Sequence, residues 1–265
     1  MHIVERIKRV DPFSFSFGLT IGNFDGFHRG HQEIIRKLVS GSKKRNLHSA
    51  VITFKEHPLK LINKDAPPQL MSRMEKIEWF EKLGVEILFY VDFDESLSGM
   101  KPLRFLLLLD ETIGPKLYCL GRGFRFGFHN EGNVELIEQY GSDLNYDLID
   151  VDDVRMDGSA VSSTRIREAV QCGDLETANR LLGRPYAVWL ERKGSDEKRL
   201  VPFLPHTALP PDGAYQGELL AVGTKEKSWQ RVMVSENTFK VNVRNRGSGA
   251  LFRFLFLTGG VEKGF

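Results

Sequence analysis

Apolar side chains occupy every second position from Phe13 to Ile21, which is the period of a β-strand and not of a helix. A glycine-containing loop, residues 22–26, follows at once. Beyond it, apolar residues recur at helical spacing as far as Gly41, where we expect the helix to end. The apolar positions are Phe13, Phe15, Phe17, Leu19 and Ile21 in the strand and Ile34, Ile35 and Leu38 in the helix. The chain therefore opens with a predicted strand, loop and helix.

The same alternation continues over the next hundred residues. Because strands that alternate with helices form parallel sheets covered on both faces, the pattern predicts an α/β fold with a Rossmann-like parallel sheet. Ligands of such sheets bind at the carboxyl ends of the strands. The further predicted strands are 49–54, 85–91, 116–120 and 148–151, and the further predicted helices are 73–83 and 102–109.

The pattern changes after residue 185. Two short helices are predicted over 162–182, broken at Cys172-Gly173-Asp174, and Gly183-Arg184-Pro185 ends the second. We place a domain boundary there, giving domains 1–185 and 186–265. The second domain shows strands without a helical period, which predicts a small antiparallel β-barrel or sandwich. Its predicted strands are 186–190, 214–222, 230–235, 239–243 and 251–257.

Charge and composition narrow the class of protein. Lys and Arg number 37 and Asp and Glu 35, a formal charge of +2, so no nucleic-acid partner and no anionic membrane partner is expected. The basic run 43–45 is interpreted as a solvated helix end. No apolar run approaches the length of a membrane span, and residues 1–6 do not resemble a signal peptide, so a cytoplasmic location is expected.

The two cysteines, Cys119 and Cys172, cannot build a disulfide framework and have no zinc-binding spacing. Both are expected to be buried small apolar residues. The composition gives no indication of the oligomeric state.

The strongest chemical signal is the segment 22–31, Gly-Asn-Phe-Asp-Gly-Phe-His-Arg-Gly-His. Glycines let the backbone approach a ligand, and a helix start offers N–H groups and a positive dipole end to phosphates. His28 and His31, three residues apart, would point the same way and could neutralise a triphosphate. A His-x-x-His pair could also be a surface coincidence or half of a metal site, but a strand–loop–helix junction favours a phosphate site.

A second segment, 162–167 (Ser-Ser-Thr-Arg-Ile-Arg), again combines hydroxyl groups and guanidinium groups at a predicted helix start. Ser162 could simply be an N-cap. Arg165 and Arg167 favour an anion, because a purely structural helix start prefers acidic residues near the positive dipole end.

A third segment, 121–127 (Gly-Arg-Gly-Phe-Arg-Phe-Gly), follows the predicted strand 116–120. A glycine-rich loop in this place is often no more than a turn. A fourth segment, 53–58 (Thr-Phe-Lys-Glu-His-Pro), follows the predicted strand 49–54.

These segments together carry a family resemblance. The His-x-Gly-His spacing resembles the nucleotidyltransferase superfamily, and residues 20–31 closely resemble the adenylyltransferase half of bacterial FAD synthetases, the bifunctional riboflavin kinase/FMN adenylyltransferases. Segments 162–167 and 173–186 are similar to the second ATP-phosphate motif of that family. Segments 53–58 and 121–127 resemble its flavin side, except that the family has Asp or Asn where this chain has Gly123.

The resemblance implies an FMN adenylyltransferase that makes FAD and pyrophosphate from FMN and ATP, with Mg²⁺ bridging the phosphates and no general base. The implied catalytic residues are His28, His31, Ser163, Thr164 and Arg165. The implied ATP-binding residues are Gly22, Asn23, Phe24, Asp25, Gly30, Ser162 and Arg167. The implied flavin-binding residues are Phe54, Pro58, Phe124, Arg125, Phe126 and Gly127, with Phe128 as a further ring that could stack on the flavin. Core packing is the alternative for each phenylalanine.

The second domain departs from the family pattern. Segment 209–215 resembles the approach to a central strand of the family's kinase barrel, but the Pro-Thr-Ala-Asn motif is absent. Its nearest fragment, 205–208 (Pro-His-Thr-Ala), lacks the asparagine, and the chain ends at Phe265 without room for the family's terminal helix. We expect a degenerate kinase-like domain with lost or impaired riboflavin kinase activity. The alternatives are a bifunctional enzyme, a flavin-binding protein without catalysis, and transfer to another phosphate ester.

Overall fold

The computed structural model describes residues 1–7, 16–62, 66–193, 198–204, 206–224, 227–241 and 251–258. The chain divides into two compact units. The first contains Met1–Pro67 and Arg73–Ala160, and the second contains Pro68–Ser72 and Val161–Phe265.

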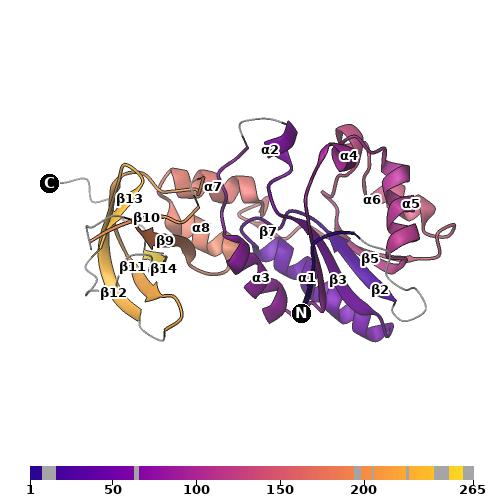
Figure 1. The fold of residues 1–265 in the computed structure, drawn as a ribbon, viewed down its shortest axis with the longest axis horizontal. Helices are drawn as coiled ribbons and strands as arrows, with labels where there is room; N and C mark the ends of the chain where they lie inside the picture. Colours follow the sequence, from indigo (N-terminus) through magenta and orange to yellow (C-terminus); the bar gives the residue numbers. More distant parts are fainter. Residues whose placement is uncertain are drawn as a thin grey trace. The chain divides into compact units, whose positions relative to one another are not determined.

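The first unit is built on a six-stranded sheet in the order β1-β4-β3-β2-β5-β6, in which every neighbouring pair is parallel. The predicted Rossmann-like α/β fold is confirmed, and Figure 1 shows β2, β3 and β5 of this sheet side by side. The strands are β1 (His2–Val4), β2 (Phe17–Ile21), β3 (His48–Phe54), β4 (Ile87–Val91), β5 (Pro115–Gly121) and β6 (Asp147–Val151). A separate two-stranded sheet is formed by β7 (Arg155–Met156) and β8 (Ser159–Ala160).

Helices cover both faces of the sheet. Helix α1 contacts β2, β3 and β5, while α5 and α6 supply Phe105, Leu109 and Ile137 to the apolar core on the other face. Successive side chains of β5 point to opposite faces of the sheet. Tyr118 and Leu120 belong to that core, whereas Cys119 lies on the α1 face and donates to the Ile34 carbonyl. The helices of this unit are α1 (Arg29–Lys44), α2 (Leu59–Ile62), α3 (Arg73–Lys82), α4 (Glu95–Ser98), α5 (Pro102–Thr112), α6 (Val134–Tyr140) and the 3₁₀ turn η1 (Phe128–Asn130).

The prediction that a helix ends at Gly41 is wrong, because α1 continues to Lys44. Gly41 lies inside the helix, where a Cβ atom would come within 2.7 Å of Ile149 Cδ1. Glycine is needed here for close packing of the helix on the sheet and not for chain reversal. The basic run 43–45 is exposed, as expected. Phe13 and Phe15, the first two positions of the predicted first strand, lie outside the described residues.

The second unit is a closed antiparallel barrel with two helices, which decides between the predicted barrel and sandwich. Large aromatic side chains fill it, among them Tyr186, Tyr215, Phe239, Phe254 and Phe256, each less than 2% exposed. Of the predicted strand 239–243, residues 242–243 lie outside the described residues. The barrel order is β10-β13-β12-β11-β14-β9. The elements are α7 (Ser163–Gln171), α8 (Leu175–Leu182), β9 (Tyr186–Arg192), β10 (Arg199–Pro202), β11 (Gly213–Ala221), β12 (Lys227–Ser235), β13 (Thr238–Lys240) and β14 (Leu251–Thr258).

Helices α7 and α8 group with the barrel, although the predicted boundary at 185/186 assigned them to the first domain. Asn179 of α8 connects them to it by hydrogen bonds to the Tyr186 N–H and the Phe256 carbonyl. The segment Pro68–Ser72 also belongs to this unit, since Gln69 pairs with Thr207 in a parallel bridge. The prediction that residues 1–185 carry one function and residues 186–265 another stays a prediction.

The prediction for the cysteines is half right: Cys119 is buried, but Cys172 is exposed. Cys172 follows α7 as its C-cap residue, a position at a helix end where the chain meets solvent. No helix within the described ranges is long and apolar enough to cross a membrane.

Candidate active site

The carboxyl edge of the sheet gathers the predicted site residues of the first unit. The chain leaves β2 to form β3 on one side and later returns to form β5 on the other, so the strand order switches between β2 and β5. Crevices for ligands lie at such switch points in open α/β sheets. The loop 22–28 follows β2 and the loop 122–127 follows β5, so the two most glycine-rich predicted motifs flank this point.

The loop after β2 adopts an unusual backbone conformation. Phe24, Gly26 and Phe27 have φ angles of 52°, 77° and 41°, in the left-handed region that costs a non-glycine residue free energy. Gly22 begins the loop with a hydrogen bond from its N–H to the Ile52 carbonyl. A loop held in this conformation requires support from its surroundings.

Aromatic packing supplies part of that support. The Phe24 and Phe27 rings meet the Phe80 ring of α3 edge to face, with centroids 5.3 and 5.0 Å apart, and Phe27 stacks on Trp79 at 5.5 Å. Phe24 is 3% exposed, so its side chain belongs to the core. Any contact of Phe24 with ATP would therefore come from its backbone.

The two histidines lie together at the start of α1. His28 is the N-cap, its Nδ1 accepting a hydrogen bond from the His31 N–H at 3.4 Å, and the two imidazole rings stack with centroids 3.6 Å apart. The predicted common direction of the pair is thus observed. Gly30 is the second residue of the helix, and its first turn contains no acidic residue.

Lys76 of α3 contacts the loop after β2, and the sequence analysis did not select it. It is 7% exposed, and its Nζ donates to the Asn23 carbonyl at 2.7 Å, where the Thr53 hydroxyl also donates at 3.2 Å. Burial lowers the pKa of Lys76 to about 8, an effect that the nearby Asp25 carboxylate opposes. Lys76 and the buried Phe80 are four residues apart and therefore share a helix face. A lysine on the same face as an apolar residue is the feature of the sequence that could have indicated its burial.

The shifted pKa predicts a pH-dependent stability. The folded pKa of about 8 lies below the ordinary 10.5, so between these values the unfolded chain binds more protons and stability rises with pH. Relative to a Lys76→Met variant, the free energy of unfolding of the wild type should increase by about 3 kcal/mol from pH 8 to pH 10.5. Urea unfolding of both proteins across this range measures the difference. A difference that stays constant or falls would contradict the buried environment.

The second predicted phosphate motif lies at the start of α7 in the other unit. Ser162 is the N-cap, its hydroxyl accepting from the Arg165 N–H at 3.3 Å, so the structural alternative for Ser162 is observed. Ser163 and Arg165 are half-buried and Thr164 is exposed. Arg167 is buried, and its Nε donates to the Pro68 carbonyl at 2.7 Å. Arg167 thus anchors the segment 68–72 within its own unit.

The loop after β5 contains the predicted flavin-side residues. Phe124 is half-buried and stacks on Phe126 at 5.5 Å, while Phe126 is 7% exposed and belongs to the core. Arg125 is exposed and its Nη1 donates to the Phe124 carbonyl. Gly127 has a φ of 74°, and a Cβ there would lie 2.8 Å from Pro102. Phe124 and the neighbouring Phe128, which is 41% exposed, are the rings available to a ligand.

Gly123 and the end of β3 complete the predicted positions. A Cβ at Gly123 would meet no heavy atom within 4 Å, so an acidic side chain would fit there. Phe54 is half-buried and packs edge to face on Phe93 at 5.1 Å. Pro58 is half-buried immediately before α2.

Several cations at the carboxyl edge already have acidic partners. Lys55 pairs with Asp92 at 3.0 Å, and Arg122 pairs with Asp150 and Asp152, each at 3.0 Å. These carboxylates raise the pKa of the Arg122 guanidinium. In each pair the carboxylate partly neutralises the positive charge of the lysine or arginine. The two histidines and the N-terminus of α1, which follow β2, are therefore the better candidates for binding an anion.

No group of three or more His, Cys, Asp or Glu side chains in the described part of the chain could hold a metal ion.

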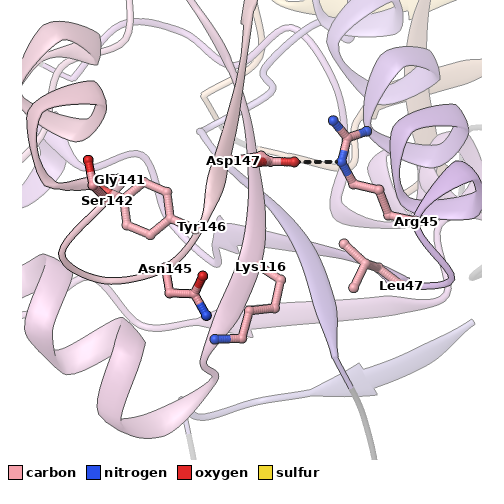
Figure 2. Close-up of a pocket in the computed structure, with 8 residues that line it drawn as sticks. All are labelled: Arg45, Leu47, Lys116, Gly141, Ser142, Asn145, Tyr146 and Asp147. Atoms are coloured by element: carbon pink, nitrogen blue, oxygen red, sulfur yellow. Dashed lines mark hydrogen bonds and ion pairs between the residues drawn. The ribbon is translucent and has the colours of Figure 1, made fainter.

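A cavity of about 570 Å³ lies at the opposite edge of the sheet. Leu47 precedes β3, Lys116 is the second residue of β5 and Asp147 is the first of β6, so the cavity opens at the amino ends of these strands (Figure 2). Arg45 and Asp147 on its wall form an ion pair at 2.8 Å. None of the predicted site residues lines this cavity, so we do not include it in the candidate site.

Comparison with known proteins finds relatives that share one description. The chain is 33% identical over 216 residues to the bifunctional riboflavin kinase/FMN adenylyltransferase of Escherichia coli, covering 78% of this chain and 69% of that protein. It is 30% identical over 191 residues to the protein of the same description from Buchnera aphidicola, covering 71% of this chain and 61% of that one.

A crystal structure of a protein from Streptococcus pneumoniae, described as a macrolide-efflux protein, matches with a TM-score of 0.86 and 24% identity. The match covers 100% of this chain and 91% of that one, and it shows the fold alone. The model of the family described as FAD synthetase matches residues 15–165, which is more than half of the chain. On these matches, the chain belongs to the FAD synthetase family.

Proposed function

We propose that the chain is an FMN adenylyltransferase, which converts ATP and FMN to FAD and pyrophosphate. The observation that carries the proposal is the family match over 15–165, a segment that contains both loops at the switch point. The relatives' printed name includes the same activity, but the chain spans less than two thirds of the Buchnera protein. The family therefore supports the activity, and the stacked histidines at a helix start supply a matching site for an anion.

The reaction needs little proton transfer. The phosphate of FMN is largely dianionic at neutral pH, since phosphate monoesters have a second pKa near 6, and its oxygen can attack the α-phosphorus of ATP directly. Catalysis then consists of positioning the two substrates and stabilising the negative charge that grows on pyrophosphate. Mg²⁺ bound to the phosphates would withdraw part of that charge.

The proposed roles follow from the local structure of each residue. His28, His31 and the Gly30 backbone bind phosphate oxygens at the start of α1, and the loop 22–25 contacts the nucleotide mainly through its backbone. The hydroxyls of Ser163 and Thr164 and the guanidinium of Arg165 bind ATP phosphates. Arg167 is the weaker candidate, because its Nε already donates to the Pro68 carbonyl. Asp25 would hold Mg²⁺ or the ribose.

Release of pyrophosphate tests the proposal. The protein is supplied with ATP and Mg²⁺, with and without FMN, and pyrophosphate is measured by a coupled assay. FMN-dependent release is expected. Binding of FMN without any release would favour the flavin-binding alternative. Release with another phosphate ester and none with FMN would favour a different acceptor.

The proposed flavin side leads to a prediction for Phe128. Replacing this exposed ring by alanine should raise the KM for FMN about fivefold, because an aromatic stacking contact contributes about 1 kcal/mol. The KM for ATP should change little. Phe203→Ala is the matched control, since Phe203 is 40% exposed on the barrel unit, against 41% for Phe128. Equal KM values for FMN in both variants would exclude Phe128 from the flavin site.

We further propose that the barrel lacks effective riboflavin kinase activity, because the Pro-Thr-Ala-Asn motif of the family is missing from its sequence. Incubation with riboflavin, ATP and Mg²⁺ should yield no more FMN than a reaction without protein. Efficient FMN production would instead establish the bifunctional alternative.

A further inference from the structure

Lys76 is an unusual choice of residue for its position. Lysine is rarely fully buried, because an ammonium group loses its hydration there. Lys76 also lies in the N-terminal half of α3 (Arg73–Lys82), where the positive end of the helix dipole disfavours a cation. The aromatic contacts of Phe24 and Phe27 with α3 already attach the loop to this helix. Packing alone therefore does not explain the lysine.

Two contacts indicate what the ammonium group does. It donates to the Asn23 carbonyl at 2.7 Å, directly before the left-handed residues of the loop. It also lies close enough to the Asp25 carboxylate for that charge to act on its pKa. Asp25 is 5% exposed, so water screens its negative charge poorly.

We propose that Lys76 is a positioning residue for ATP: it fixes the loop 22–27 through the Asn23 carbonyl and offsets the charge of Asp25, which would otherwise repel the triphosphate. This inference rests on the proposed function, which assigns the loop to ATP. It adds a residue of α3 that contacts the loop and not the nucleotide. The same arrangement explains why a buried cation is kept despite its cost.

Two substitutions separate the charge from the hydrogen bond. Lys76→Met removes both, whereas Lys76→Gln keeps an N–H donor and removes the charge. We expect both to raise the Kd of ATP–Mg²⁺ at least about tenfold, the size typical of removing one member of a buried charge pair at a binding site. The KM for FMN should stay within about twofold in each variant. Lys44→Met, at the exposed end of α1, is the control and should bind ATP as the wild type does.

Titration calorimetry with ATP–Mg²⁺ measures the Kd without FMN, and thermal unfolding shows that each variant is folded. If Lys76→Met does not fold, Lys76→Gln decides. The double variant Asp25→Asn/Lys76→Gln removes both charges. It is titrated with ATP free of Mg²⁺, so that the Mg²⁺ contact proposed for Asp25 is not involved, and it should recover at least half of the loss in log Kd that Lys76→Gln shows under the same conditions. A purely structural role for Lys76 would not produce this recovery.

The inference is overturned if folded Lys76→Gln binds ATP as tightly as the wild type, or if the double variant binds Mg²⁺-free ATP no better than Lys76→Gln does. These outcomes are distinct from failure of the proposed function. A wild type that binds ATP but makes no FAD would refute the adenylyl transfer and leave the role of Lys76 to be judged from the Kd values.

Discussion

Replacing His31 by alanine should lower kcat for FAD formation by about 10² or more, which is the usual loss for one donor that stabilises charge in the transition state. His31 is the better probe of the pair, because His28 is also the N-cap of α1. Loss of a cap costs about 1 kcal/mol of stability and would confuse the result for His28. Steady-state kinetics with FMN and ATP, together with a thermal unfolding curve, measure the effect.

His48→Ala is the matched control for this experiment. His48 begins β3 at the amino edge of the sheet and pairs with Glu86, away from the carboxyl-edge loops. Its turnover should equal that of the wild type within about twofold. Near-wild-type turnover of His31→Ala would refute the assignment of the histidine pair to catalysis.

Replacing Gly217 by alanine should destabilise the barrel by about 3 kcal/mol. A Cβ at this position would lie 2.0 Å from the Leu255 carbonyl oxygen of the paired strand and 2.7 Å from Phe254 Cζ. The first of these atoms is backbone, and the register of β11 and β14 already shifts at Gln216/Gly217, so relief requires the two strands to separate. Urea unfolding followed by aromatic fluorescence measures the loss.

Gly223→Ala provides the comparison within the same unit. Gly223 has a φ of 79°, but a Cβ there would meet no heavy atom within 4 Å. Only the backbone conformation is strained, at a cost of about 1 kcal/mol. If both variants lost the same stability, close packing between β11 and β14 would not be the reason for glycine at position 217.

Periodicity predicted the elements that carry the site, because each has a clear local signal. The alternation of apolar residues before Gly22 correctly predicted β2. The hydroxyl residues at 162–164 correctly predicted the N-cap of α7. The short helices α2 and α4 were not predicted, since four residues are too few to show a helical period. The predicted helix end at Gly41 was wrong because glycine is used both to end helices and to allow close packing inside them.

Other features depend on contacts between distant parts of the chain. The grouping of Pro68–Ser72 with the barrel unit rests on hydrogen bonds of Gln69 to His206 and Ala208, almost 140 residues later, and no local pattern announces them. The importance of Lys76 likewise depends on its contact with Asn23, 53 residues earlier. Distant contacts also decide which of the predicted flavin-side phenylalanines are exposed: Phe126 is buried and Phe128 is not.

Tracing the phosphates of ATP is the most direct test of the proposed adenylyl transfer. The protein is incubated with FMN, Mg²⁺ and ATP labelled at either the α- or the γ-phosphate, and the products are separated by chromatography. The account predicts that the α-label appears in FAD and the γ-label in pyrophosphate, in equal amounts. Absence of labelled FAD, with the protein folded and ATP bound, would contradict it.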